Sequence, residues 1–207
     1  MDYQALSNAV GVIAKTIKQR LSVLEASYVV VKLPSYVENF GKRVVKSPKY
    51  FFTDAGLLAY LLGLETPSQV LRDTLLGSIF QNPFVIEVLK QRCNSGYDAN
   101  LYFFRDSNGS EIDLLCKTRN GLVGIEIQAA FTRHGKLANQ HVRFAANNHP
   151  LNQSLVVYKS VELQPGNGVN AISYDRLVPA LQFEQVVLEV LVWIVVRICS
   201  ACLINFK

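Results

Sequence analysis

Cysteine is scarce in this sequence, and no secretory signal opens it. The 207 residues contain four cysteines, and the N-terminus lacks the apolar run of a signal peptide. Cys199 and Cys202 form a C-x-x-C pair, but no second pair or histidine cluster accompanies them, and a structural zinc site needs four ligands. We therefore expect a reduced, cytoplasmic protein in which these cysteines pack as apolar side chains.

The chain also lacks a phosphate-binding loop and a catalytic triad pattern. No G-x-x-x-x-G-K-[ST] occurs in it, so no ATP site of that type is expected within these residues. The histidines are few, and no triad pattern surrounds them. We expect them at surface positions of a helix: His134, His141 and His149.

Excess positive charge is confined to the first quarter of the chain. Residues 1–50 hold eight Lys and Arg against three Asp and Glu, which equals the net charge of +5 of the whole chain. The remaining residues are balanced. This asymmetry indicates an N-terminal module that faces a polyanion.

Residues 1–53 have the pattern of a winged helix-turn-helix. A short helix over residues 3–9, a turn at Gly11 and a second helix from Ile13 to Ser27 with one basic face fit the helical part. Strand-like runs over 28–34 and 44–54 fit the wing. The module could contact DNA, or it could mediate protein contacts with its lysines merely solvated. The candidate phosphate contacts are Lys15, Lys18, Arg20, Lys42, Arg43, Lys46 and Lys49.

Residues 54–75 are expected to form a helical linker. Asp54 is a good N-cap, Gly63 a good stop, and Pro67 restarts the chain. A longer helix follows over residues 77–93, with Pro83 in its first turn or at a kink.

Residues 76–183 are expected to form an α/β domain with a mixed sheet, which makes the fold class α/β. Asn108-Gly109 and the segment 119–121 predict tight turns that chain three antiparallel strands. A helix over 134–147 and a buried strand over 154–159 complete the domain.

Acidic residues stand on two successive strands of this sheet. Alternation predicts Glu111 and Asp113 on one face of their strand, with Ile112 and Leu114 on the other. On the following strand Val123, Ile125 and Ile127 face one way and Glu126 and Gln128 the other. Asp113 and Glu126 could therefore converge at one edge of the sheet.

Two converging carboxylates suit Mg²⁺, which prefers oxygen ligands. In phosphodiester hydrolysis such a metal polarises the phosphate and acidifies a bound water, and a nearby lysine stabilises developing charge. Gln128 carries no charge. Asp113 and Glu126 could equally be solvent-facing acids on half-buried strands.

The sequence resembles the C-terminal part of a large group of prokaryotic AAA-type ATPases of poorly defined function. The similar stretches, within residues 3–160, include "FGKRVVKSPKYFFTDAGLL", "GSIFQNPFVIEVLKQR", "LYFFRDSNGSEIDLL" and "GIEIQ". In that group a P-loop ATPase domain precedes a winged helix and a domain of PD-(D/E)XK restriction-endonuclease-like fold. The resemblance therefore implies both modules here, without the ATPase domain in this chain.

The resemblance also implies roles for particular residues. Asp113 and Glu126 correspond to the acidic pair of the nuclease motif and would be the metal ligands, with Glu87 as a further candidate. Gln128 stands where the group usually has the catalytic lysine, and Gln81 stands where a glutamate is usual. Two lost charges imply a degenerate, inactive nuclease site.

The C-terminal segment 184–207 has no counterpart in the resemblance. It is strongly apolar but contains Glu189 and Arg197, and central charges cost about 2.5–3.5 kcal/mol each in a membrane span. A helix packed on the sheet is preferred to a membrane anchor or an out-of-frame tail.

Three hypotheses remain open. The chain is a nucleic-acid-binding or regulatory module with a degenerate nuclease-like domain. Alternatively, it is a Mg²⁺-dependent nuclease in which Gln128 replaces the lysine. As a third possibility, it is a protein-interaction module that docks on an ATPase subunit and binds no DNA.

Overall fold

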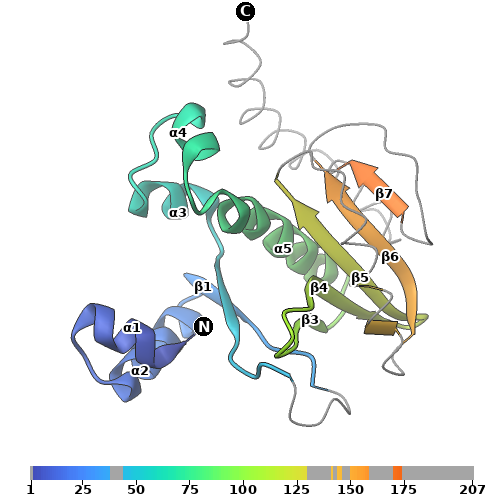
Figure 1. The fold of residues 1–207 in the computed structure, drawn as a ribbon, viewed down its shortest axis with the longest axis horizontal. Coiled ribbons are helices and arrows are strands. Elements are labelled where there is room, and N and C mark those ends of the chain that lie inside the picture. The colour runs from blue at the N-terminus through green and yellow to red at the C-terminus, as the bar shows by residue number, and fades with distance from the viewer. Residues whose placement is uncertain are drawn as a thin grey trace, which may run out of the picture.

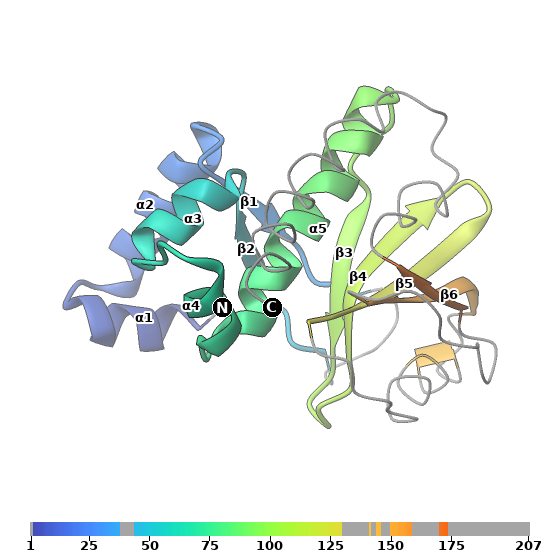
Figure 2. The same cartoon turned by 90° about the horizontal axis from the view of Figure 1, so that it is seen from above.

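The protein is a mixed α/β structure in which one long helix lies between a group of short helices and a sheet. The computed structural model describes residues 2–37, 44–129, 141, 144–145, 150–158 and 170–173. Figure 2 shows α5 between α1–α4 on one side and the sheet on the other. The expected α/β class with a mixed sheet is confirmed.

Two helices open the chain, as the apolar spacing predicts. Helix α1 spans Tyr3–Val10 and helix α2 spans Ala14–Ala26. The Asp2 carboxylate caps α1 by accepting hydrogen bonds from the first-turn backbone. Gly11 ends α1 in the left-handed conformation at φ 74°, which glycine adopts without steric cost.

A two-stranded antiparallel sheet follows the helices. Strand β1 covers Val30–Leu33 and β2 covers Lys49–Phe52. Between these strands two segments of the connection lie along the edge of the larger sheet, where Ser35 bridges Phe103 and Val44 bridges Asp106. The N-terminal hairpin is therefore hydrogen-bonded to the large sheet and does not project freely from it.

Three further helices lead to the sheet. Helix α3 spans Ala55–Leu61 with Asp54 as its N-cap, α4 spans Pro67–Arg72, and α5 spans Leu76–Asn94. The expected start at Asp54 and restart at Pro67 are confirmed. Pro83 lies inside α5, not in its first turn; it costs the helix one backbone hydrogen bond because proline has no N–H.

The large sheet has five strands in the order β3-β4-β5-β6-β7 (Figure 1). The first three pair antiparallel through the two predicted turns, and β6 and β7 add in parallel. Strand β7 was not predicted, because its four residues give too short a pattern. The bounds are Leu101–Arg105 for β3, Glu111–Thr118 for β4, Gly121–Gln128 for β5, Leu151–Tyr158 for β6 and Asn170–Ser173 for β7.

The main core lies between α5 and one face of this sheet. Val85 and Val88 of α5 are buried against Leu114, Ile125 and other apolar residues of the central strands. A smaller cluster on the opposite face contains Phe104, Ile112, Leu115 and Phe144. Both faces of the sheet are therefore covered, as expected for central strands with continuous apolar runs.

Asn82 of α5 joins the N-terminal hairpin to this core. Its amide Nδ2 donates to the Phe52 carbonyl at 2.8 Å, and its Oδ1 accepts from the Phe52 backbone N–H at 2.8 Å. The side chain is 3% exposed. It completes the backbone hydrogen bonding of β2 in the way that a neighbouring strand would.

Parts of the expected organisation fall outside the described residues. Of the helix expected over 134–147, the described positions His141, Phe144 and Ala145 are helical. The apolar segment 184–207 is not among the described residues. Within those that are described, no helix has the length and apolar character to cross a membrane. The boundaries proposed for the modules stay a prediction.

Replacing Asn82 by Ala should lower the free energy of unfolding by about 2 kcal/mol, because both backbone groups of Phe52 lose their partner. Urea denaturation followed by circular dichroism measures the change. The matched control is Asn94→Ala at the exposed end of α5, where a change within about 0.5 kcal/mol is expected. Equal effects in the two variants would contradict this role for Asn82.

Candidate functional site

Asp113 lies where strands β4 and β5 separate. The paired ladder between them ends at Leu114 and Ile125. Beyond that point the Asp113 carboxylate enters the gap, and its Oδ2 accepts from the Ile127 backbone N–H at 3.0 Å. The residue is 7% exposed, so this carboxyl group is an internal part of the sheet.

The expected alternation of β4 is wrong at this position. Ile112 and Leu114 do not share a face, because Ile112 packs in the smaller cluster with Phe104 and Leu114 packs against α5. The cause is a β-bulge, seen as a register shift opposite Tyr102 and Phe104. A bulge redirects a side chain and is frequent beside functional sites.

Glu126 meets Asp113 inside the protein. Glu126 is 3% exposed, and its carboxyl group is hydrogen-bonded to that of Asp113. Burial, together with the neighbouring Asp113 charge, raises the pKa of Glu126 to about 10. Burial also raises the pKa of Asp113. At neutral pH the pair therefore retains a proton and carries less than two charges.

Gln81 of α5 contacts the carboxyl pair from the helix side of the sheet. Its amide Nε2 donates to Asp113 Oδ1 at 2.8 Å, so both oxygens of Asp113 accept hydrogen bonds from protein groups. Gln128 is the last residue of β5. Glu87 lies six residues beyond Gln81, roughly 9 Å along the helix axis, and pairs with Lys90 at 2.8 Å.

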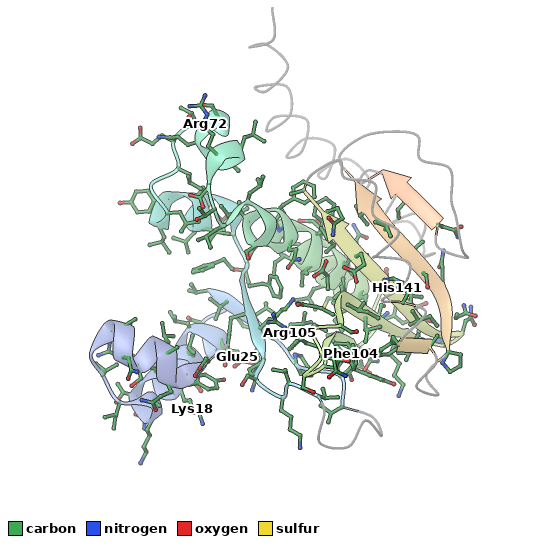
Figure 3. The ribbon with its side chains drawn as sticks, in the orientation of Figure 1. Lys18, Glu25, Arg72, Phe104, Arg105 and His141 are labelled. Atoms are coloured by element: carbon green, nitrogen blue, oxygen red, sulfur yellow. The ribbon has the colours of Figure 1, made fainter. Side chains whose placement is uncertain are left out.

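Lys49 approaches the same cluster from β2. Its Nζ lies 2.6 Å from Glu111 Oε1 and 3.9 Å from Asp113 Oδ1. Arg105, which is labelled in Figure 3, places its Nε 3.4 Å from Glu111 Oε2. Lys49 was predicted as a phosphate contact, but here it is engaged by carboxylates. No sequence pattern links Lys49 with Glu111, since the hairpin brings them together from distant segments.

His141 lies against the pair on the other side, and the expectation of a surface position is wrong for it. It is 2% exposed, and its Nε2 lies 3.6 Å from Glu126 Oε1. Among the residues with a described placement, neither ring nitrogen has a hydrogen-bond partner. Burial lowers the pKa of His141 to about 4, so the ring is neutral at pH 7.

Gly124 makes room for this histidine. A Cβ atom at Gly124 would lie 3.3 Å from His141 Cε1 and 2.9 Å from Leu151 Cδ1. The missing side chain thus lets the imidazole ring approach β5, two residues before Glu126. The glycine was a signal for close approach that the sequence interpretation did not use.

Of the remaining residues predicted to contact nucleic acid, four are exposed and two lie outside the described residues. Lys15, Lys18 and Arg20 are exposed on α2, and Lys46 is exposed in the connection between β1 and β2. Lys18, which lies over the Tyr3 ring, is on the side of the molecule away from His141 (Figure 3). Lys42 and Arg43 lie outside the described residues.

The donor set around Asp113 is poor in metal ligands. Among the residues that the structure describes, no group of three or more His, Cys, Asp or Glu could hold a metal ion. Besides the Glu126 carboxyl group, the neighbours of Asp113 are an amide N–H, a backbone N–H and, at 3.9 Å, an ammonium group. These three groups are hydrogen-bond donors and supply no lone pairs to a cation.

Comparison with known proteins finds two domain matches. A model described as Domain of unknown function (DUF8612) matches residues 1–68, and one described as Domain of unknown function (DUF4143) matches residues 76–177. The second match begins at Leu76, the first residue of α5. It therefore includes the helix and the whole large sheet.

Two relatives come from mycobacteria. The chain is 31% identical over 127 residues to the uncharacterized protein Rv2008c of Mycobacterium tuberculosis and to the uncharacterized protein Mb2031c of Mycobacterium bovis. The match covers 61% of this chain and 28% of each relative, so the chain spans less than a third of their length. No solved structure matches the chain significantly.

The buried carboxyl pair should make stability fall as pH rises above 7. The pKa of Glu126 is raised in the folded state, so the folded protein holds a proton that the unfolded chain has released. Stability should fall by up to about 1.4 kcal/mol per pH unit between pH 7 and 9. His141 does not contribute in this window, because its pKa lies lower in both states.

The Glu126→Gln variant should remove most of this slope, since the amide does not ionise. Urea denaturation at pH 7, 8 and 9 compares the variant with the wild type. Asp98→Asn is the control, as Asp98 is an exposed acid, and it should keep the wild-type slope. A wild-type stability that does not change with pH would contradict the protonated pair.

Proposed function

We propose that the chain is a nucleic-acid-binding or regulatory module with a winged helix and a nuclease-like domain that is catalytically inactive. Helices α1 and α2 followed by the β1–β2 hairpin support the winged helix. A helix-covered mixed sheet with Asp113 and Glu126 at the divergence of β4 and β5 supports a PD-(D/E)XK-like domain. The module would act with an AAA-type ATPase subunit.

The observation that carries the inactive assignment is the hydrogen bond from Gln81 to Asp113. A glutamate at that position would add a third carboxylate to the pair. The glutamine instead donates to Asp113, and the pair is further neutralised by the proton held at Glu126. A resident Mg²⁺ would have to displace both this proton and the Gln81 donor, and this cost supports a site without the cation.

Exposed cations on α2 support the binding of nucleic acid. Lys15, Lys18 and Arg20 stand on the second helix of the pair, the position that enters the major groove in helix-turn-helix proteins. Glu25 is the one acid on this helix. Side chains of this type bind phosphates and give affinity that depends on salt.

The Lys15→Glu/Arg20→Glu variant should bind duplex DNA more weakly than the wild type. The slope of log affinity against log salt should fall by about 0.9 for each phosphate that the variant no longer neutralises. Fluorescence anisotropy with a labelled duplex, over a series of salt concentrations, measures both effects. The matched control is Arg72→Glu/Lys90→Glu, which makes the same charge change on α4 and α5.

An unchanged slope in the α2 variant would contradict DNA binding by this helix. Absence of DNA binding by the wild type would leave a protein-interaction module as the function of these helices.

A second candidate is an active Mg²⁺-dependent nuclease, and the position of Lys49 favours it. Its ammonium group lies 3.9 Å from Asp113 and could supply the charge that Gln128 lacks. We expect no cleavage of plasmid DNA in Mg²⁺ or Mn²⁺ by the wild type. Cleavage that Asp113→Ala and Lys49→Gln both abolish would establish the nuclease and overturn the inactive assignment.

A further inference from the structure

A groove lies at the end of the sheet remote from Asp113. It is about 880 Å³ in volume, within the range of roughly 300–1,000 Å³ for small-molecule sites. Its walls come from the end of α5, the loop before β3, the β4–β5 turn and the start of β6. In Figure 1 the β4–β5 turn is on the side of the molecule opposite α1 and α2.

The charge of the groove favours an anion. Arg92, Lys117 and Arg119 line it, and among the described lining residues Asp98 supplies the one carboxylate. Lys117 and Arg119 are exposed at the end of β4 and in the turn. They lie four and six residues from Asp113, roughly 13–20 Å along an extended chain. The two cations therefore belong to a site separate from the carboxyl pair.

An aromatic ring stands among these cations. The guanidinium of Arg92 lies 5.9 Å and that of Arg119 5.6 Å from the centre of the Tyr97 ring. Tyr97 is half-buried. Cations beside an aromatic ring are the combination that binds a base together with its phosphate.

The loop that carries Tyr97 is held in place. Arg92 Nε donates to the Asp98 carbonyl at 2.9 Å, and the Tyr97 N–H donates to the Arg92 carbonyl at 2.9 Å. On the other side of the loop the Lys117 N–H donates to the Asn100 carbonyl at 3.0 Å. These hydrogen bonds fix the groove before a ligand arrives, which lowers the cost of binding.

Neutral polar groups complete the lining. Asn120 belongs to the turn, and Asn152 and Gln153 belong to β6. Their amides can donate to and accept from the edges of a base. The groove thus offers a cationic part, a ring and amides within one site.

From these features we propose that the groove binds a nucleotide unit, with its phosphate at Lys117 and Arg119 and its base on the Tyr97 ring, from which the Arg119 guanidinium would turn away. The unit is either a free nucleotide or part of a single strand. The inference is independent of DNA binding by α2, since the two surfaces lie on opposite sides of the molecule.

The test measures binding of two probes, AMP by calorimetry and a fluorescein-labelled oligothymidylate of ten nucleotides by anisotropy. Lys117→Glu/Arg119→Glu should weaken binding by about ten-fold or more. Arg72→Glu/Lys90→Glu makes the same charge change elsewhere and should stay within about two-fold. Binding of AMP would identify a free nucleotide, and binding of the decamer alone would identify a strand.

Tyr97→Leu tests the base contact. The variant should bind each probe that the wild type binds several-fold more weakly. The concentration of inorganic phosphate that displaces the bound probe should stay unchanged. Circular dichroism checks that the variant folds. The proposal is overturned if neither probe binds, if the groove variant and its charge control lose affinity equally, or if Tyr97→Leu keeps wild-type affinity for the probe that the wild type binds. If only the Lys15→Glu/Arg20→Glu variant lost affinity for the probes, the binding site would be α2, and binding in the groove would be contradicted.

Discussion

Two consecutive amide side chains on α5 hold the described structure together. Gln81 donates to Asp113 on the large sheet, and Asn82 donates to and accepts from the backbone of Phe52 on the N-terminal hairpin. Because successive residues of a helix point in directions about 100° apart, one turn of α5 can serve both neighbours. The helix and the bridges from Ser35 and Val44 to the sheet edge together fix the hairpin relative to the sheet, which places Lys49 beside the carboxyl cluster.

The carboxyl cluster depends on this arrangement for its charge. Asp113 and Glu126 are buried side by side, and burial of two like charges without compensation is unfavourable. Three groups stabilise the pair: a proton held by Glu126, the side-chain amide of Gln81 and the backbone N–H of Ile127. Glu111 then engages Lys49 and Arg105. The result is a cluster whose negative charge is partly compensated by a proton, by Lys49 and by Arg105.

Local patterns were enough to predict most elements, but not the contacts between them. The helices at both sides of Gly11, the N-cap at Asp54, the helix start at Pro67 and the two tight turns of the sheet follow from short-range rules. The pairing of Asp113 with Glu126 also followed, since successive antiparallel strands are neighbours. The bulge in β4, the burial of His141 and the position of Lys49 were missed. The burial of His141 and the position of Lys49 depend on segments that meet only in the folded chain. The bulge lies within one hairpin, where no residue pattern marks it.

We infer that Gln81 leaves the carboxyl pair with too few ligands for a divalent cation. Calorimetric titration with Mn²⁺ on the wild type and on the Gln81→Glu variant distinguishes the two cases. We expect no binding to the wild type and measurable binding to the variant, which has a third carboxylate beside Asp113 and Glu126. Binding to the wild type that Asp113→Ala abolishes would contradict this inference and identify the pair as a working metal site.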